Sequence, residues 1–306
     1  MPGDADERKE MFMKYRQFGS TGISVSAVSY GGIVSAGIYG GAEYPSEGQD
    51  ASDRYVSWAI DQGVNYFDVA PAYGNAQEQL GNSLLPYRRR IFLACKTGRR
   101  DRDGAEEDLR NSLKLLHTDY LDVYQLHAVS SMQDVEQAVA PGGCMEVIGK
   151  LKEKGIARNI GFTAHSEDAA LKMIELFPFD TVLFPFNWFM NMAHDMGKRL
   201  IPAARTKGMG ILAMKAFIER RWEDQEDRGC FPKSWCKPID TDLEPEFGIA
   251  AMKYTLSLGV DTLVPPGNFK SFSFAVEHID ECLASPEPDL ELLKRKLETV
   301  RGKEFF

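Results

Sequence analysis

The fold of this chain is decided by the stretch Asn65-Tyr66-Phe67-Asp68-Val69-Ala70-Pro71-Ala72-Tyr73-Gly74, in which a short apolar run breaks into a loop. The apolar residues around Asp68 predict a buried strand, and the proline and glycine that follow predict its end. Asp68 closes that strand and Tyr73 lies just beyond it. Both side chains are therefore expected on one rim of a sheet or barrel.

The same pattern, an apolar strand followed by a helix, recurs outward from this stretch. An apolar run at 23–30 ends at Gly31-Gly32, and further strands are predicted at 91–96, 120–127, 158–163, 181–184, 209–214 and 262–264. The predicted helices lie at 51–62, 75–84, 105–116, 145–154, 167–177, 195–207 and 247–258, followed by a last helical region at 273–282 and 290–300. Eight strand and helix units without a linker predict an α/β chain folded as one (β/α)8 TIM barrel, with its site on the rim after the strands.

A doubly wound sheet is the alternative fold. It is disfavoured because Gly31-Gly32-Ile33 does not make the Gly-x-Gly-x-x-Gly pattern of a dinucleotide-binding sheet. We expect a disordered tail at 1–12 and a single barrel domain at 13–306.

Composition and charge exclude several classes of protein. The 306 residues are 43% hydrophobic and 26% charged, which is typical of a globular protein with a large core. The net charge of -9, without a dominant basic block, argues against nucleic acid or an anionic membrane as partner. No apolar stretch approaches the roughly 20 residues that span a bilayer. The charged N-terminus lacks the apolar core of a secretory signal, so we expect a cytoplasmic protein.

The cysteines and histidines predict no metal site. The five cysteines form no Cys-x-x-Cys pair, which suits reduced thiols inside a cell, and the five histidines include no His-x-x-x-His. Local spacing therefore offers no set of metal ligands.

Four polar residues follow neighbouring predicted strands in order, namely Asp68, Tyr73, Lys96 and His127. Taken singly, Lys96 could reach for solvent and His127 could be a satisfied core group. In a barrel, however, the ends of these strands converge, and together the four residues predict a site.

Such a quartet suits proton transfer to a carbonyl oxygen. A free tyrosine has a pKa near 10, and an adjacent ammonium, here Lys96, lowers it. Asp68 is expected to hold Lys96 by an ion pair, while His127 donates a hydrogen bond to a substrate carbonyl oxygen. A proton from Tyr73 would complete the reduction of that carbonyl if hydride arrives from a cofactor.

The chain resembles the aldo-keto reductase family from Met13 onward. The opening Lys14-Tyr15-Arg16-Gln17-Phe18-Gly19-Ser20-Thr21-Gly22-Ile23-Ser24-Val25-Ser26 is similar to the family's N-terminal hairpin and first strand. Phe67-Asp68-Val69-Ala70, Ala72-Tyr73-Gly74, Cys95-Lys96-Thr97 and Leu126-His127 match its four catalytic positions. The resemblance implies a (β/α)8 fold and a metal-free reduction of aldehydes and ketones with NADP(H), NAD(H) being the alternative cofactor.

The cofactor positions depart from the family pattern. The family's Ser-Asn after strand five is Thr163-Ala164-His165, its Gln after strand six is Leu183, and its Tyr after strand seven is Met214, which still packs on a ring face. The Pro-Lys-Ser and Arg after strand eight are replaced by 264–268 and by Phe272, with Lys270 or Lys215 as substitute cations. The cofactor-binding positions implied by the resemblance are Gly32, Asp68, Thr163, His165, Met214, Lys215, Phe217, Pro266, Gly267 and Asn268.

Segments 161–165 and 213–215 resemble a prokaryotic branch of the family that often carries an iron-sulfur extension. The sequence ends at Phe306 without the cysteine run, so no cluster is expected. The resemblance also implies a monomer or small homo-oligomer.

Two long connections, 130–143 and 218–246, are expected to wall the substrate pocket, with Trp222 and Trp235 near its mouth. Two other functions stay open beside carbonyl reduction. One is a cofactor-binding regulatory barrel with little turnover, suggested by the altered cofactor positions. The other is a lyase or isomerase that uses Lys96 as a Schiff base.

Overall fold

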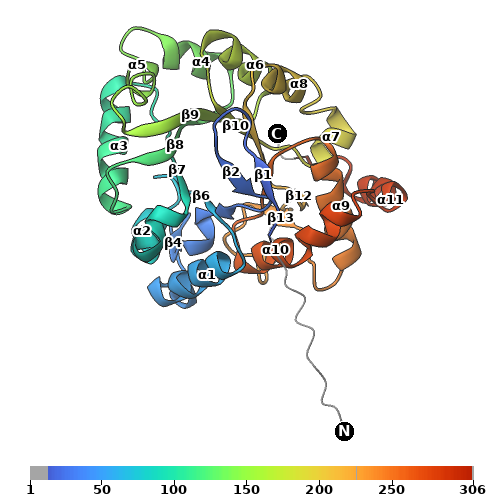
Figure 1. Ribbon diagram of the computed structural model, residues 1–306. Helices are drawn as coiled ribbons and strands as arrows, with labels where there is room; N and C mark the ends of the chain where they lie inside the picture. The colour runs from blue at the N-terminus through green and yellow to red at the C-terminus, as the bar shows by residue number, and fades with distance from the viewer. Residues whose placement is uncertain (1–12, 225, 305–306) are drawn as a thin grey trace.

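The structure, a computed structural model, describes residues 13–224 and 226–304. Its centre is a sheet of eight parallel strands surrounded by helices (Figure 1). The strands are β3 (Tyr30–Gly31), β6 (Tyr66–Asp68), β7 (Phe92–Thr97), β8 (Leu121–Val129), β9 (Ala157–Ala164), β10 (Thr181–Phe184), β11 (Gly210–Met214) and β14 (Thr262–Val264). A parallel bridge between Val28, two residues before β3, and Leu263 of β14 joins the two ends of the sheet. The predicted (β/α)8 TIM barrel is confirmed.

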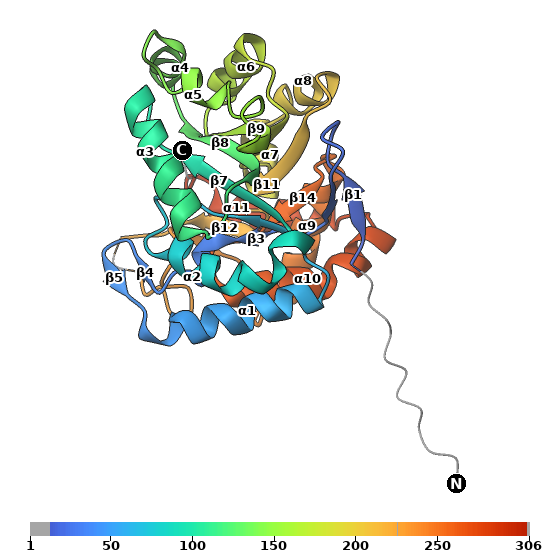
Figure 2. The ribbon, with the colours of Figure 1, turned by 60° about the vertical axis from the view of Figure 1, so that its left-hand side comes forward.

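Most of the helices surround the barrel, and α11 packs outside this layer against α9 and α7 (Figures 1 and 2). They are α1 (Gln49–Asp61), α2 (Ala76–Leu84), α3 (Arg102–Leu115), α4 (Met132–Val139), α5 (Met145–Ile148), α6 (Glu167–Leu176), α7 (Trp188–His194), α8 (Leu200–Thr206), α9 (Pro245–Ser257), α10 (Phe269–Ala284) and α11 (Leu290–Val300). Short 3-10 helices lie at η1 (Gly32–Ser35), η2 (Pro45–Glu47) and η3 (Leu85–Arg90).

The N-terminal end of the barrel is closed by a hairpin of β1 (Tyr15–Gln17) and β2 (Ser24–Ser26). Phe18, fully buried, meets Tyr66 edge-on with ring centroids 5.5 Å apart inside the barrel. Gly210 makes room for it, since a Cβ there would lie 2.5 Å from the Phe18 ring. This apolar plug closes one end of the barrel and leaves the other rim for a site.

Several predicted boundaries were wrong. The run at 23–30 does not form one strand, because β2 pairs in the hairpin and only Tyr30–Gly31 enters the barrel. The helix predicted at 145–154 ends at Ile148, and the one predicted at 195–207 is α8 alone, preceded by the unpredicted α7. The helix predicted at 273–282 extends from Phe269 to Ala284.

The two long connections have secondary structure of their own. The first, 130–143, contains α4, and the second, 218–246, contains the paired strands β12 (Ile218–Arg221) and β13 (Cys236–Pro238). A third short pair, β4 (Ile38–Tyr39) and β5 (Ala42–Glu43), follows η1. The tail predicted at 1–12 lies outside the described residues.

Candidate active site

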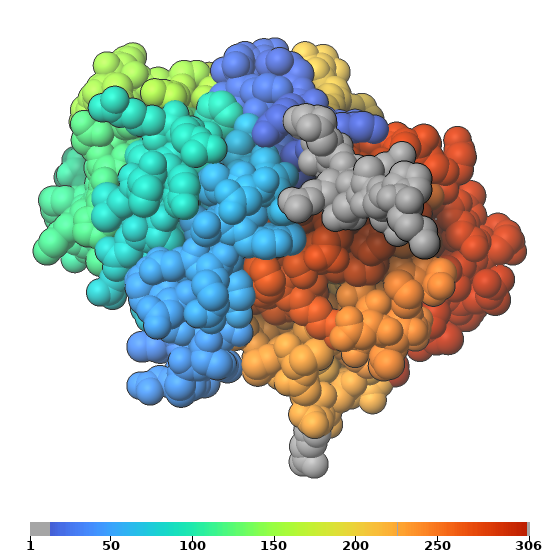
Figure 3. Space-filling view, turned by 60° about the horizontal axis from the view of Figure 1, so that its bottom comes forward, coloured from blue at the N-terminus to red at the C-terminus, as the bar shows by residue number. Residues whose placement is uncertain are grey.

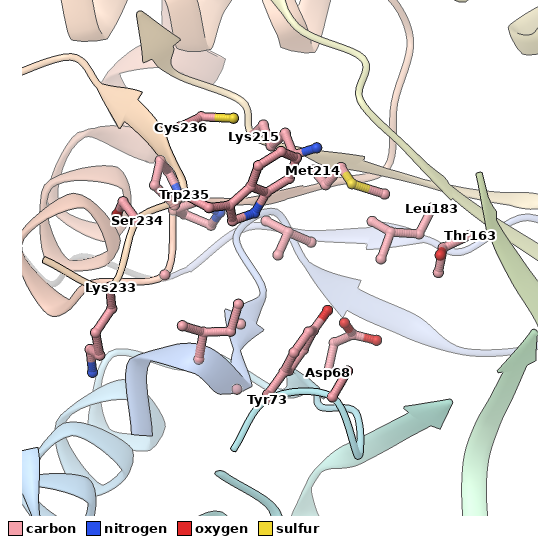
Figure 4. Close-up of a pocket in the computed structure, with 18 of the residues that line it drawn as sticks. Asp68, Tyr73, Thr163, Leu183, Met214, Lys215, Lys233, Ser234, Trp235 and Cys236 are labelled. Carbon is pink, nitrogen blue, oxygen red and sulfur yellow. The ribbon is translucent and has the colours of Figure 1, made fainter. Parts of the chain in front are cut away.

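The rim after the barrel strands holds a cavity of about 280 Å³. All four residues of the predicted quartet line it, so the structure brings Asp68, Tyr73, Lys96 and His127 together. Figure 4 shows Asp68 and Tyr73 on one side of this cavity and Met214, Lys215 and Trp235 on the other.

Asp68 and Lys96 form the buried floor of the cavity. They end neighbouring parallel strands, β6 and β7, so their side chains converge. The Lys96 ammonium donates to Asp68 Oδ2, and to the Val69 carbonyl at 3.3 Å. Burial alone would lower the pKa of Lys96, but Asp68 and Tyr73 reverse this effect and raise it. Lys96 is therefore a cation at neutral pH.

The sequence analysis missed Gln125, which completes this floor. Its amide Nε2 donates to Asp68 Oδ1 at 2.7 Å, so both carboxylate oxygens are engaged. Gln125 lies two residues before His127 on β8, and the period of two in a strand places both on the inward face. That alternation was the signal in the sequence that could have identified it.

Tyr73 stands over the Lys96 ammonium, which lies 5.2 Å from the centroid of its ring. The loop that carries it turns at Gly74, where φ is +59° and a Cβ would lie 1.7 Å from the Ile38 carbonyl oxygen. Burial raises the pKa of Tyr73, and Lys96 offsets only part of this. The expectation of a lowered pKa was wrong because burial outweighs the cation. The phenol is protonated at neutral pH.

His127 meets the Tyr73 ring edge-on, with centroids 5.8 Å apart. Burial and the positive charge of Lys96 lower the pKa of His127 to about 3. Its imidazole is therefore neutral at physiological pH, with one N–H to donate. The cavity thus presents two neutral donors, a phenol and an imidazole, above a buried ion pair.

The opposite wall is built after β11 and from the segment around β12 and β13. Lys215 has a φ of +62°, and its ammonium lies 3.9 Å from the centroid of the Trp235 ring. Burial lowers the pKa of Lys215 to about 7. Cys236, beside them on the wall, has a pKa raised to about 12 by burial and so remains a thiol.

One end of the cavity holds Thr163 and Leu183, as Figure 4 shows. The Thr163 hydroxyl accepts a hydrogen bond from the Ala128 amide at 2.7 Å, and its own O–H remains to donate. His165 also lines the cavity, with its ring 6.4 Å from that of Trp235, and burial followed by Lys215 lowers its pKa to about 3.

The remaining predicted cofactor positions divide into two groups. Gly32, Pro266 and Gly267 line the cavity. Phe217 is buried in the core against Phe274, and Asn268 caps α10 by accepting from the Ser271 amide at 2.7 Å, so neither lines it.

Two further lining residues, Lys233 and Tyr39, were also missed. Their contacts join segments far apart in sequence, and no local pattern marks them. Of the two tryptophans expected at the mouth, Trp235 lines the cavity, while Trp222 lies outside it and donates to the Ser234 carbonyl at 2.6 Å.

Within the described residues, no group of three histidine, cysteine or acidic side chains is placed to hold a metal ion. Nor does that part of the chain contain a helix with the length and apolarity that crossing a membrane requires.

The molecule is a (β/α)8 barrel with a polar cavity on the rim after its strands, and comparison with known proteins identifies the family. The model of the Aldo/keto reductase family matches residues 37–229, more than half of the sequence. The chain belongs to the aldo/keto reductase family and is an oxidoreductase. Members of this family reduce carbonyl groups with NAD(P)H in general.

Individual relatives agree with this assignment. The chain is 28% identical over 246 residues to aldo-keto reductase YhdN of Bacillus subtilis, covering 72% of this chain and 70% of that protein. It is 27% identical over 217 residues to L-galactose dehydrogenase of Arabidopsis thaliana, covering 66% and 64%. The fold is similar to that of aldo-keto reductase AKR11C1 from Bacillus halodurans in its holo form, with a TM-score of 0.67, 17% identity and coverage of 96% and 98%.

Proposed function

We propose that this protein reduces an aldehyde or ketone to an alcohol, with Tyr73 as the proton donor. The observation that carries the proposal is the position of the Tyr73 phenol, held over the Lys96 and Asp68 ion pair at the wall of a cavity. When bound, NAD(P)H would supply the hydride to the carbonyl carbon.

The residues of the chain protonate and orient the oxygen of that carbonyl. Hydride addition at carbon breaks the C=O π bond and leaves an electron pair on oxygen, to which the Tyr73 O–H gives its proton. The Lys96 ammonium stabilises the phenolate that forms, and Asp68 keeps Lys96 charged and oriented. The neutral His127 imidazole donates a hydrogen bond to the same oxygen and fixes the carbonyl for attack.

The residues at the cavity suit a nicotinamide ring with its carboxamide. Met214 and Trp235 offer apolar surfaces for a planar ring, while Thr163 and His165 offer polar atoms for an amide. The Cβ of a residue at Gly267 would lie 2.6 Å from Ile33, so glycine lets these two walls approach. The net charge of -9 disfavours a nucleic acid or an anionic membrane as a partner.

The Schiff-base alternative is weaker on this geometry. Amine attack on a carbonyl needs the neutral lysine. The raised pKa of Lys96 and its ion pair with Asp68 keep the ammonium form.

The proposal is tested with Tyr73→Phe, which removes the donated proton and keeps the ring. Turnover with a panel of aldehydes and ketones, followed by consumption of reduced cofactor, should fall by about 10²–10⁴-fold, the usual contribution of general acid catalysis. Affinity for the cofactor, measured by quenching of tryptophan fluorescence, should stay within about twofold of wild type. The hydroxyl that is removed acts on the substrate oxygen in the transition state, so binding of the cofactor in the ground state is unchanged.

Tyr39→Phe is the matched control, because Tyr39 lines the same cavity, whereas the hydrogen bonds of the Lys96 ammonium go to Asp68 and to the Val69 carbonyl. It should retain most of the turnover. Full activity of Tyr73→Phe would exclude Tyr73 as the proton donor.

A further inference from the structure

Gln125 is a buried amide inside the barrel, next to the candidate site. It lies on the inward face of β8, two residues before His127, and is fully buried. In a TIM barrel the inward side chains of alternate strands share one layer. The strands β6 and β8 are alternate strands with β7 between them. Gln125 therefore reaches Asp68 across the strand that carries Lys96.

One hydrogen bond joins Gln125 to the site. Its Nε2 donates to Asp68 Oδ1 at 2.7 Å. An ionised carboxylate only accepts hydrogen bonds, so the amide nitrogen, and not the amide oxygen, must face it. Gln125 Oε1 is buried and has no hydrogen-bond partner among the residues that the structure describes. A buried acceptor in this state costs stability that an apolar side chain of the same size would not, so packing alone does not explain the amide.

The hydrogen bond fixes which way the Asp68 carboxylate points. A carboxylate turns readily about its last torsion, whose preferences are broad and roughly twofold. Because Gln125 holds Oδ1, Oδ2 is the oxygen that accepts from the Lys96 ammonium. The ammonium then lies 3.3 Å from the Val69 carbonyl oxygen and 5.2 Å from the centroid of the Tyr73 ring.

We propose that Gln125 is a positioning residue for the reduction, because its hydrogen bond turns Asp68 toward Lys96 and so holds the ammonium at the Tyr73 phenol. This inference rests on the proposed function and adds a residue to the same site. When the Tyr73 O–H gives up its proton, the ammonium stabilises the phenolate only while it stays at this place. Gln125 acts on the reacting oxygen through Asp68 and Lys96.

Gln125→Met tests the inference, because it keeps the length of the side chain and removes the donor. The kcat for carbonyl reduction, followed by consumption of reduced cofactor, should fall by about 10- to 100-fold, the effect of one hydrogen bond to a charged group. KM and the affinity for the cofactor should stay within about twofold of wild type, because the lost stabilisation acts on a charge that develops in the transition state.

Gln77→Met is the matched control. Gln77 is another buried glutamine, and it lies on α2, which packs beside α1 in the layer of helices (Figure 3). Its Nε2 donates to Ser112 Oγ at 2.7 Å and to Cys95 Sγ at 3.2 Å. Cys95 precedes Lys96 on β7 and so points to the opposite side of that strand. Gln77→Met should therefore keep kcat within about twofold of wild type.

The titratable groups around Gln125 come from three neighbouring strands and the loop after one of them. They are Asp68 and Tyr66 on β6, Tyr73 after β6, Lys96 on β7 and His127 on β8. On β9 the partner of Gln125 in register is Gly161, which has no side chain. In the wild-type protein these groups keep their charges at neutral pH, because Lys96 is held as a cation and Tyr73 and His127 are held neutral.

Gln125→Glu adds a readout that a loss of packing would not produce. The introduced carboxyl can donate to Asp68 Oδ1 only while it carries a proton. Two carboxyls that share a site bind one proton between them and release it at higher pH. The kcat of Gln125→Glu, divided by that of wild type at the same pH, should therefore fall by about tenfold or more as the pH rises from about 5 to about 9.

The ratio to wild type cancels the titration of groups that both proteins share, such as Lys215 at the cavity wall. Gln77→Glu is the control for this profile and should run parallel to wild type. Circular dichroism at each pH checks that every variant is folded, and Gln125→Glu carries the test where Gln125→Met does not fold.

The outcomes separate this inference from the proposed function. Wild-type kcat in Gln125→Met, or in Gln125→Glu across this pH range, together with lost turnover in Tyr73→Phe, overturns the inference and leaves the reductase proposal intact. An equal loss of kcat in Gln77→Met and Gln125→Met also overturns the inference, since any buried glutamine would then have the same effect. No consumption of reduced cofactor by the wild-type protein with any aldehyde or ketone of the panel overturns both.

Discussion

Burial and neighbouring charge act in opposite directions on the residues of the candidate site. At Lys96 the ion pair with Asp68 outweighs burial and keeps the ammonium, whereas at Tyr73 burial outweighs the ammonium and keeps the phenol. At His127 burial and Lys96 act together and keep the imidazole neutral. The result is a cation below two neutral donors, and the proposed reduction of a carbonyl uses these protonation states.

Lys215 should make the stability of the protein depend on pH. Burial lowers the pKa of Lys215 from 10.5, its value when exposed in the unfolded chain, to about 7 in the folded state. Between these two pH values the unfolded chain holds a proton that the folded chain lacks. The free energy of unfolding should therefore rise with pH in this interval, by up to about 1.4 kcal/mol per pH unit. Below pH 7 both states carry the proton and this contribution to the slope disappears.

Urea unfolding of wild type and Lys215→Met, at intervals from pH 6 to pH 10, measures this effect. The difference between the two proteins should grow in favour of wild type as the pH rises above 7. Lys114→Met, at an exposed lysine of α3, is the control and should run parallel to wild type. A parallel profile for Lys215→Met as well would show that Lys215 is charged in the folded protein.

At the scale of elements, one segment spans the rim beside the cavity. We call residues 218–224 and 226–238, which form β12, β13 and part of their connection, the strap. Lys233 fastens the strap to η1 and the residue after it, through the Val34 and Ala36 carbonyls. Trp235 and Cys236, two and three residues further on, then face the cavity.

Lys233→Met should loosen the strap and speed the release of bound cofactor. A hydrogen bond from a charged group contributes about 1.5–3 kcal/mol, so the dissociation rate should rise by roughly tenfold or more. Stopped-flow tryptophan fluorescence, to which Trp235 at the cavity contributes, measures this rate. Lys237→Met, on the strap but paired only with Glu219 and Glu226 in the described structure, is the control. Equal rates for Lys233→Met and wild type would show that the strap does not retain the cofactor.

The elements that the sequence predicted well are those with a local pattern. The strand at 181–184, the strand at 262–264 and the helix at 290–300 have the bounds expected, because apolar periodicity and local breakers define them. The strap and α7 were not predicted. Lys233 reaches carbonyls almost 200 residues away in sequence, and a contact of that kind leaves no local signal.

The residues of the candidate site also divide into those that a sequence pattern predicts and those that it does not. Asp68, Tyr73, Lys96 and His127 were predicted because strand ends converge in a barrel. Gln125 could have been predicted from the alternation of inward and outward side chains along β8, but it was missed. Phe217 and Asn268, placed in the site by resemblance, turned inward to the core and to the cap of α10, because packing after β11 and β14 sets their directions.

At the scale of the whole molecule, the apolar packing and the candidate site lie at opposite ends of the barrel. Its N-terminal end is filled by the hairpin and the apolar side chains around Phe18, while its C-terminal end holds the buried ion pair and the cavity. The cost of burying Asp68 and Lys96 is met by their mutual contact, by Gln125 and by the Val69 carbonyl. The family assignment makes the protein an oxidoreductase, and the cavity with the buried ion pair lies on the C-terminal rim.

The most direct measurement of the central claim follows hydride itself. The protein is supplied with reduced nicotinamide cofactor carrying deuterium at both C4 positions and with a carbonyl substrate, and the alcohol is analysed by mass spectrometry and NMR. Carbonyl reduction predicts one deuterium on the former carbonyl carbon of each product molecule, and a smaller amount of product with the same label from Tyr73→Phe. Product without deuterium, or a substrate trapped on lysine by borohydride, would contradict hydride transfer at this site and favour a lyase or isomerase.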